Sequence, residues 1–321
     1  MKTSVAVCTY NGEKYLREQI DSILNQTIHV DEIIVCDDGS SDKTIQILEK
    51  YSKENPNLFK IYKNEINLKS VKNFEKAICL CSGEYIFLSD QDDIWIENKV
   101  EKMISYFDQN PNIDVLATNG FCIDENSKVH EKYAIWDVPE FLREKNIDFE
   151  YYKLITYISN IATGASMAFR RKIISEIIPF PVIKGIHHDE WIAIISSSNN
   201  SFKLLSEKYF YYRIHDNQQV GGVFFDKTEK EKIMLMAIFD INNLNQSFIG
   251  FKKRIKKLSL AYSRNQVLFK NQSNYNHLFK SNLTEINNQY CQIVKIMNNK
   301  YPISSFFLNL SDKILNKRQL K

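Results

Sequence analysis

The 321-residue sequence contains no run of about 18 apolar residues, so it predicts no membrane-spanning helix. Its six cysteines are scattered without a paired C-x-x-C spacing, which argues against a structural zinc site and for reduced, buried thiols. No G-x-G-x-x-G follows the first strand-like segment, which argues against a dinucleotide-binding dehydrogenase. No charged and then apolar leader precedes that segment, and we therefore expect a cytoplasmic protein.

Charge is unevenly divided along the chain, although its formal net value is only +3. Residues 226–321 hold 17 basic and 6 acidic side chains, whereas residues 1–225 hold 25 basic and 33 acidic ones. The densest basic stretch, Phe251–Leu258, indicates either contact with anionic lipid headgroups or a solvated helix face. Nucleic acid is a weaker interpretation because no recognised nucleic-acid motif accompanies the stretch, and we expect no such partner.

Short apolar segments alternate with segments of helical periodicity in the first part of the chain. Ser4–Cys8, Glu32–Cys36 and Tyr85–Leu88 are strand-like, and apolar residues at helical spacing follow the first of them after a turn. Such alternation predicts a doubly wound α/β sheet. From about Lys227 onward the spacing is helical. We therefore predict an α/β domain over residues 1–225 and a basic helical C-terminal region over residues 226–321.

Polar residues follow three of the predicted strands. Thr9-Tyr10-Asn11 follow the first, Asp37-Asp38 the second, and Asp90-Gln91-Asp92-Asp93 the strand at Tyr85–Leu88. Because ligands bind outside the carboxyl ends of the strands in such sheets, we expect these residues to line one crevice. Carboxylates at a strand tip are typical of a site for Mg²⁺ or Mn²⁺ with a substrate phosphate. The alternative is a solvated turn that caps the next helix.

Six sequence blocks, in order along residues 1–225, resemble the family-2 glycosyltransferases with the GT-A fold, and the third resembles rhamnosyltransferase-like members. The blocks are Val7–Gly12, Asp37–Asp42, Ser89–Trp95, Thr163–Ala168, His187–Trp191 and Tyr212–His215. The resemblance implies a Rossmann-like, doubly wound mixed sheet with a helical C-terminal appendage. It also implies inverting transfer of a sugar from a nucleotide-diphosphate donor, either dTDP-rhamnose or a UDP-hexose. The implied acceptor is a hydroxyl of a cell-surface glycan or of a lipid-linked glycan precursor.

The resemblance also implies roles for individual residues. Those expected at the donor nucleotide and its diphosphate are Thr9, Tyr10, Asn11, Asp37, Asp38, Asp90 and Arg213. Asp92 is expected to bind the metal, Mn²⁺ or Mg²⁺, and His215 is either a further metal ligand, a diphosphate contact or a structural residue. Those expected near the acceptor are Asp93, Trp95, Gly164, His188 and Trp191.

An inverting displacement needs a base that takes the proton of the acceptor hydroxyl. Asp189 and Glu190 lie in the block that corresponds to the family's late acidic motif, at the start of a predicted helix. Adjacent residues on a helix do not face the same way, so only one of the two carboxylates can point into the site. We choose Asp189. Either carboxylate could instead complement the positive end of the helix dipole.

Two other classes of protein combine a nucleotide-binding α/β sheet with acidic residues. A sugar-phosphate nucleotidyltransferase would need a glycine-rich basic loop after the first strand, and Cys8–Glu13 is not such a loop. A non-catalytic module that binds a sugar nucleotide or a glycan would not need both metal-binding carboxylates and a base. The basic C-terminal region further suggests peripheral contact with the cytoplasmic face of the inner membrane, where lipid-linked acceptors would lie.

Overall fold

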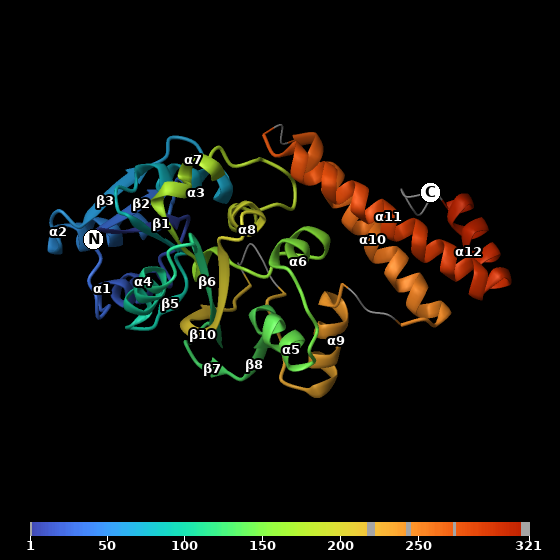
Figure 1. Cartoon of the computed structure of the whole chain (residues 1–321). Coiled ribbons are helices and arrows are strands. Elements are labelled where there is room, and N and C mark those ends of the chain that lie inside the picture. Colours follow the sequence, from blue (N-terminus) through green and yellow to red (C-terminus); the bar gives the residue numbers. More distant parts are fainter. Residues whose placement is uncertain (1, 217–221, 242–244, 272–273, 316–321) are drawn as a thin grey trace. The chain divides into compact units, whose positions relative to one another are not determined.

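The computed structural model describes residues 2–216, 222–241, 245–271 and 274–315 of the chain (Figure 1). The chain forms two compact units. The first contains residues 1–141 and 161–233, and the second contains residues 142–160 and 234–321. This division differs from the predicted boundary at residue 225, because residues 142–160 fold with the C-terminal helices although the sequence pattern groups them with the strands before them.

The first unit is built on a nine-stranded mixed sheet with the strand order β3-β2-β1-β4-β9-β6-β10-β5, in which β7 pairs with β6. Two further short strands, β8 and β11, pair with each other. The strands are β1 (Thr3–Thr9), β2 (Glu32–Asp37), β3 (Phe59–Lys63), β4 (Tyr85–Ser89), β5 (Ile94–Trp95), β6 (Val115–Ile123), β7 (Val129–His130), β8 (Lys132–Ala134), β9 (Ala168–Arg170), β10 (Phe202–Arg213) and β11 (Phe224–Asp226).

Helices of the first unit follow its strands, as the alternating pattern predicts. They are α1 (Leu16–Leu24), α2 (Thr44–Glu54), α3 (Lys69–Leu80), α4 (Lys99–Gln109), α7 (Ile174–Ile177) and α8 (His188–Ser198), and α5 (Val138–Glu144) lies where the first unit passes into the second. Each of the longer amphipathic helices buries one apolar stripe. In α1, for example, Leu16, Ile20 and Ile23 are fully buried and recur at helical spacing.

The register of the parallel strands brings the ends of β1, β2 and β4 to one edge of the sheet. Thr9 pairs with Asp37 across β1 and β2, and Val7 pairs with Ser89 across β1 and β4. The polar residues that follow these strands therefore leave the sheet side by side, as the sequence predicts. The mixed α/β architecture with a helical C-terminal region confirms the predicted fold class.

All regular secondary structure in the described residues of the second unit is helical. Its helices are α6 (Tyr151–Tyr157), most of α9 (Glu229–Phe239), α10 (Phe248–Asn271), α11 (Asn276–Lys300) and α12 (Pro302–Leu315). The antiparallel pair α10 and α11 forms its centre (Figure 1). Tyr157 of α6 joins Ile255, Ile286 and Met297 of this pair in one buried apolar cluster, which explains why the internal segment belongs here.

Among the helices described, none combines the length and the apolar character that crossing a membrane requires.

Candidate active site

The loops after β1 and β2 are joined through buried carboxylates. Asp37 accepts hydrogen bonds from the Thr9 hydroxyl at 2.8 Å and from the N–H of Ser40 at 2.9 Å. Asp38 accepts the backbone N–H groups of Leu68 and Lys69 at 2.7 and 2.9 Å, one on each oxygen. Both side chains thus shape the rim from within the protein, because both oxygens of Asp37 and one oxygen of Asp38 already accept two hydrogen bonds each from protein groups.

Gln91 holds the loop after β1 against the loop after β4. Its side-chain oxygen accepts the N–H of Tyr10 at 2.8 Å, and its side-chain nitrogen donates to the Tyr10 carbonyl at 3.0 Å. The Tyr10 side chain itself is 48% exposed. Asn11, at a positive φ of 49°, accepts the N–H of Ser41 at 2.8 Å and so joins the same loop to the one after β2. The three predicted loops therefore form one connected rim.

Four acidic side chains concentrate negative charge at this rim. Burial, followed by the neighbouring charges of Asp92 and Asp189, raises the pKa of Asp90 to about 7. Burial also raises the pKa of Asp93 well above its usual value, with added repulsion from Asp92 and Asp90. The coupling of Asp90 to Asp189 is notable, because 99 residues separate them along the chain. The structure thus brings the predicted nucleotide and metal block and the predicted base into one electrostatic cluster.

Lys99, at the start of α4, is a buried cation next to this acidic cluster. Its ammonium group donates to the carbonyl of Ala165 at 2.7 Å and lies 4.1 Å from the centre of the Trp95 ring. Burial lowers the pKa of Lys99 to about 7, against the opposing effect of Asp93 and Asp90. The sequence pattern does not mark Lys99 as a site residue. A lysine at the start of a helix, four residues after an aromatic residue, is an ordinary pattern for a surface position.

Arg213, at the end of β10, supports the acidic loop from inside the protein. Its backbone N–H donates to Asp93 at 3.0 Å, and its Nε donates to the Asp92 carbonyl at 2.7 Å. The guanidinium is fully buried and also donates to Glu18 at 3.1 Å. This geometry does not favour the predicted diphosphate contact, because these donors point at protein oxygens. Arg213 instead holds the backbone of the loop that carries Asp92.

Asp92 and His215 are two potential metal ligands at the rim that are in direct contact. Nε2 of His215 lies 2.9 Å from a carboxylate oxygen of Asp92, and their side chains are 12% and 21% exposed. Nowhere in the described residues do three or more His, Cys, Asp or Glu side chains gather as a metal-binding group. Mg²⁺ and Mn²⁺ at nucleotide sites use one or two protein ligands and complete their shell with water and phosphate oxygens. The pair therefore fits an ion that binds together with a diphosphate.

Of the two candidate bases, Asp189 is the one turned toward the acidic cluster. It is half-buried at the first turn of α8, where one oxygen accepts the N–H of Gly164 at 3.1 Å and the other accepts the N–H of Glu190 at 2.7 Å. Burial raises its pKa, against the opposing effect of His188 and His187. Glu190 is only 4% exposed. This geometry favours the predicted choice of Asp189 over Glu190.

His188 packs inside the first unit, against Gly164, whose N–H donates to Asp189. Its ring stacks on Phe74 with centroids 4.0 Å apart, and a Cβ atom at Gly164 would lie 2.7 Å from its Nε2. Within the described part of the chain, neither ring nitrogen has a hydrogen-bond partner. Burial lowers the pKa of His188 to about 4, so the imidazole is neutral. The glycine thus permits the close approach of His188, and Gly164 in turn donates to Asp189.

Besides His188, three of the residues expected near the acceptor are in the interior, and their burial does not favour the predicted contact with a sugar. Trp95 is 3% exposed, and its ring faces the Lys99 ammonium group rather than solvent. Trp191 is 1% exposed and donates its indole N–H to the Ile177 carbonyl at 2.9 Å. Asp93 is 2% exposed and accepts the Arg213 N–H. A sugar cannot stack on or bond to side chains covered in this way, because burial removes the faces that it would contact.

The sequence predicts that the residues at the strand ends lie at one edge of the sheet, but it does not indicate which residues cross-link their loops. Gln91 is such a residue, and it lies inside the Asp90–Asp93 block, in which the sequence signal comes from the acidic neighbours. Its side-chain amide carries no charge, and its partner Tyr10 lies 81 residues earlier. The signal that could have found it is the demand that adjacent loops be cross-linked at a shared sheet edge.

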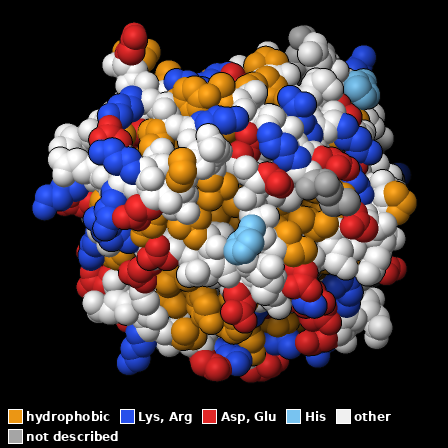
Figure 2. Space-filling model, turned by 90° about the vertical axis from the view of Figure 1, so that its left-hand side faces the viewer, with side chains coloured by type: hydrophobic (Ala, Val, Ile, Leu, Met, Phe, Trp, Pro, Cys, Tyr) orange, Lys and Arg blue, Asp and Glu red, His pale blue; other side chains and the backbone are white. Residues whose placement is uncertain are grey.

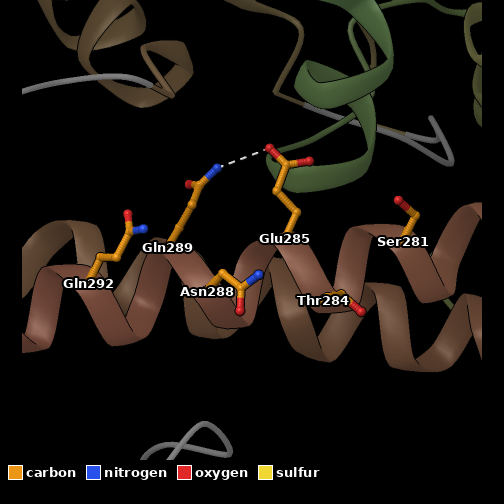
Figure 3. Close-up of a pocket in the computed structure, with 6 residues that line it drawn as sticks. All are labelled: Ser281, Thr284, Glu285, Asn288, Gln289 and Gln292. Carbon is orange, nitrogen blue, oxygen red and sulfur yellow. Dashed lines mark hydrogen bonds between the residues drawn. The ribbon is translucent and has the colours of Figure 1, made fainter.

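Two regions of the surface differ in the side chains that they carry. Figure 2 shows acidic, basic and apolar side chains interspersed over the face at the left of Figure 1. In the second unit, a row of polar side chains on α11 lines a shallow, open hollow of about 590 Å³ (Figure 3). They are Ser281, Thr284, Glu285, Asn288, Gln289 and Gln292. Glu285 accepts a hydrogen bond from Gln289 at 3.1 Å and pairs with Lys153 at 3.0 Å, so its charge is compensated locally.

Comparison with known sequences identifies a family. The family model described as Glycosyl transferase family 2 matches residues 4–178. An uncharacterized glycosyltransferase of Methanocaldococcus jannaschii is 30% identical over 233 residues, which cover 72% of this chain and 75% of that protein. An uncharacterized glycosyltransferase of Rickettsia typhi is 30% identical over 276 residues, which cover 80% of this chain and 83% of that protein.

Comparison with solved structures shows the same fold. TarS of S. aureus, in a complex with UDP-GlcNAc, is similar with a TM-score of 0.54 at 19% identity, covering 94% of this chain and 92% of that one. The mannosyltransferase PcManGT of Pyrobaculum calidifontis, in a complex with GDP-Man and Mn²⁺, is similar with a TM-score of 0.51 at 13% identity. That match covers 99% of this chain and 81% of the mannosyltransferase.

Proposed function

The chain belongs to glycosyltransferase family 2, and on this basis we propose that it transfers a hexosyl or deoxyhexosyl group from a nucleotide-diphosphate sugar with inversion at the anomeric carbon. The donor is dTDP-rhamnose or a UDP-hexose, and the acceptor is a hydroxyl of a cell-surface glycan or a lipid-linked precursor. Donor complexes of two proteins with this fold support a nucleotide sugar as substrate. The rhamnosyltransferase-like assignment rests on the Ser89–Trp95 block.

The observation that carries this proposal is the placement of Asp189 near the acidic loop, where the N–H of Gly164 holds its carboxylate and its charge helps to raise the pKa of Asp90. An inverting reaction needs a proton acceptor on the opposite side of the anomeric carbon from the leaving diphosphate. Asp189 has the properties of such a base. The N–H of Gly164 fixes its orientation, and burial raises its pKa, which makes it a better proton acceptor near neutral pH than a solvated carboxylate.

The donor diphosphate binds on the other side of this cluster. Asp92 and His215 hold the Mn²⁺ or Mg²⁺ ion, which when bound stabilises the negative charge of the departing nucleoside diphosphate. Thr9, Tyr10, Asn11, Asp37, Asp38 and Asp90 form the rim for the nucleotide. Within it, Thr9 and Asp37 act through the shape of the loops, since they bond to each other. The exposed ring of Tyr10 and the Asp90 carboxylate are the groups available for direct contact.

The acceptor hydroxyl approaches along Gly164, next to Asp189. With Trp95, Trp191 and Asp93 buried, Gly164 is the member of the predicted acceptor set that contacts the base directly. Its lack of a side chain makes room for the His188 ring beside it. His188 positions this glycine through close packing and does not itself contact the sugar.

The test is release of nucleoside diphosphate from a panel of nucleotide sugars, with Mn²⁺ or Mg²⁺ and with acceptor. Asp189→Asn should lower kcat by about 10²-fold or more with nearly unchanged donor affinity, as removal of a general base does. Asp92→Asn should weaken metal-dependent donor binding. Glu190→Gln is the matched control, and its turnover should stay within a few-fold of the unaltered enzyme.

Two results would contradict the proposal. Unaltered turnover in both the Asp92 and the Asp189 variants would remove the catalytic roles, and no turnover with any donor would favour a non-catalytic binding module. Family membership leaves the sugar-phosphate nucleotidyltransferase without support. Stabilisation of the protein by nucleoside triphosphates in preference to diphosphates would reopen it.

The basic residues of α10 support a location of the enzyme at a membrane surface. Lys252, Lys253 and Lys256 are exposed, whereas Arg254 and Lys257 are half-buried. Lys257 donates to the carbonyls of Ala237 and Ile238 at the end of α9, at 2.5 and 2.9 Å, and so serves the fold. The three exposed lysines are available to anionic headgroups at the cytoplasmic face of the inner membrane.

A further inference from the structure

Helix α12 presents an apolar stripe to solvent. Its four members, spaced three and four residues apart along one helix face, are Ile303, Phe306, Phe307 and Leu310. They are 73%, 64%, 62% and 44% exposed. In a water-soluble helix such a stripe normally faces the core. Large apolar side chains that gather on one exposed face mark a contact surface.

The stripe is distinct from the residues that attach α12 to the second unit. Ser305 is 2% exposed, and its hydroxyl donates to the carbonyl of Met297 at 3.2 Å. Leu308 packs against the apolar cluster of α10 and α11. At 3.6 residues per turn, these two lie on the side of α12 opposite the stripe. Among the described residues, Ser305 and Leu308 therefore attach α12 to the second unit, and the stripe takes no part in this attachment.

The charge of the second unit indicates what covers the stripe. Residues 234–321 hold 14 basic and 3 acidic side chains, and exposed lysines include Lys252, Lys253 and Lys256 of α10. A second copy of this unit would bring two strongly positive surfaces together, and four side chains are few beside the roughly 20–30 residues per side of a stable protein interface. An anionic lipid surface satisfies both the apolar stripe and the positive charge.

We propose that α12 is an interfacial membrane helix, which lies in the plane of an anionic bilayer with Phe306 and Phe307 among the acyl chains. This inference builds on the proposed lipid contact of the α10 lysines and adds an apolar anchor to it. Ser304 and Asn309 flank the stripe and are exposed, as expected for the sides of such a helix at headgroup level. Anchoring of this kind holds the enzyme at the surface that contains lipid-linked acceptors.

The first experiment measures co-sedimentation of the full-length protein with vesicles of phosphatidylcholine alone and of equal parts phosphatidylcholine and phosphatidylglycerol. Phe306→Glu with Phe307→Glu should lower partitioning onto the mixed vesicles roughly tenfold or more, because the apolar area that enters the bilayer is lost. The matched control is Asn288→Glu with Gln292→Glu. It adds the same charge to exposed positions of the polar row on α11, which offers nothing for the acyl chains (Figure 3).

The outcomes separate an apolar anchor from attraction of charge alone. A much larger loss for the α12 variant than for the α11 control supports the proposal. Equal losses for the two would overturn it and leave only the contact of the lysines. Loss of binding after Lys252, Lys253 and Lys256 are changed to Gln, with the α12 variant unaffected, would also overturn it. A change from dimer to monomer in the α12 variant, with unchanged vesicle binding, would identify a second copy as the occupant.

A second experiment locates the helix directly. Phe306→Trp places an indole on the stripe, whereas the native Trp95, Trp136 and Trp191 are all buried in the first unit. Fluorescence of this variant should shift to the blue on mixed vesicles and be quenched by lipids brominated on the acyl chain. Fluorescence that vesicles leave unchanged would refute insertion. Diphosphate release without vesicles should match that of the unaltered enzyme in every α12 variant, so failure of the anchor and failure of the transferase are distinguishable.

Discussion

At the scale of single residues, the cost of burying several carboxylates close together determines the protonation of the acidic side chains at the rim. Asp90, Asp93 and Asp189 each have a raised pKa because of burial, and Lys99 is the buried cation beside them. Lys99 bonds to one carbonyl and faces the Trp95 ring, so its position is closely determined. It acts on the site as a positioning residue, since its charge keeps the acidic loop compact before a metal ion binds.

Lys99→Met should therefore damage the site in a way that depends on pH. Removal of the positive charge raises the pKa of Asp90 further, so the acid limb of the kcat/KM profile should move to higher pH. The unfolding free energy should fall by about 1–3 kcal/mol, because the Ala165 carbonyl loses its buried partner. The measurements are a pH profile and urea denaturation. Lys102→Met, at an exposed position of the same helix, should change neither, and an unmoved acid limb in Lys99→Met would contradict this role.

At the scale of elements, the candidate active site depends on where the loops after adjacent strands begin. Parallel pairing of β1 with β2 and β4 puts three loop starts on one edge, and the side chains of Gln91 and Asn11 cross-link them. Helix α8 adds Asp189 from its first turn, and Gly164 ties it to the segment before β9. The rim is thus built by strands and helices that are distant in the sequence.

Replacement of Gln91 by Ala should loosen this rim without unfolding the sheet. Two hydrogen bonds to the Tyr10 backbone disappear, each contributing about 0.5–1.5 kcal/mol, so KM for the donor should rise roughly tenfold while kcat changes little. Gln91→Glu keeps the acceptor for the Tyr10 N–H and loses the donor, and an intermediate KM is expected. Steady-state kinetics with varied donor decides this. A fall in kcat at constant KM would assign Gln91 to the chemical step instead.

For the whole molecule, the division into two units separates the candidate active site from the surface that we propose contacts a membrane. Every candidate catalytic residue belongs to the first unit, whereas the apolar stripe and the densest basic stretch belong to the second. The second unit has a core of its own, with a buried amide pair among its apolar residues. Asn265 accepts a hydrogen bond from Asn282 at 2.8 Å and donates to the Thr156 carbonyl at 3.0 Å, which joins α6 to α10 and α11.

Asn265→Ala tests this division. It leaves the Asn282 amide and the Thr156 carbonyl without their buried partner, which should destabilise the second unit by about 1–3 kcal/mol. Diphosphate release, as a property of the first unit, should remain unchanged at temperatures where the variant is folded. Calorimetry and the donor assay provide the two readouts. Asn271→Ala, at an exposed position of the same helix, is the control, and parallel loss of activity with Asn265→Ala would show that the units are not independent.

Local pattern was enough to predict several elements, among them β1, β2 and β4, and the residues at their ends. Alternating strand and helix periodicity predicted the α/β sheet, because each element is encoded by residues within a few positions of one another. Polar residues after β1, β2 and β4 were predicted to converge, since parallel strands end at one edge. Local helix geometry indicated that only one of Asp189 and Glu190 could point into the site, and the observed burial of Glu190 favours the choice of Asp189.

What the sequence by itself determined about this protein is therefore its fold class and the polar residues that follow its strands. Only the tertiary structure decided which of these side chains are buried and which lie at the rim. Trp95 and Trp191 were expected near the acceptor, but packing covers their rings, and the carbonyl partner of Lys99 lies 66 residues away in the sequence. It also decided that residues 142–160 fold with the C-terminal helices. The physical reason is that burial and pairing depend on sheet register and helix packing, which join positions that no local pattern connects.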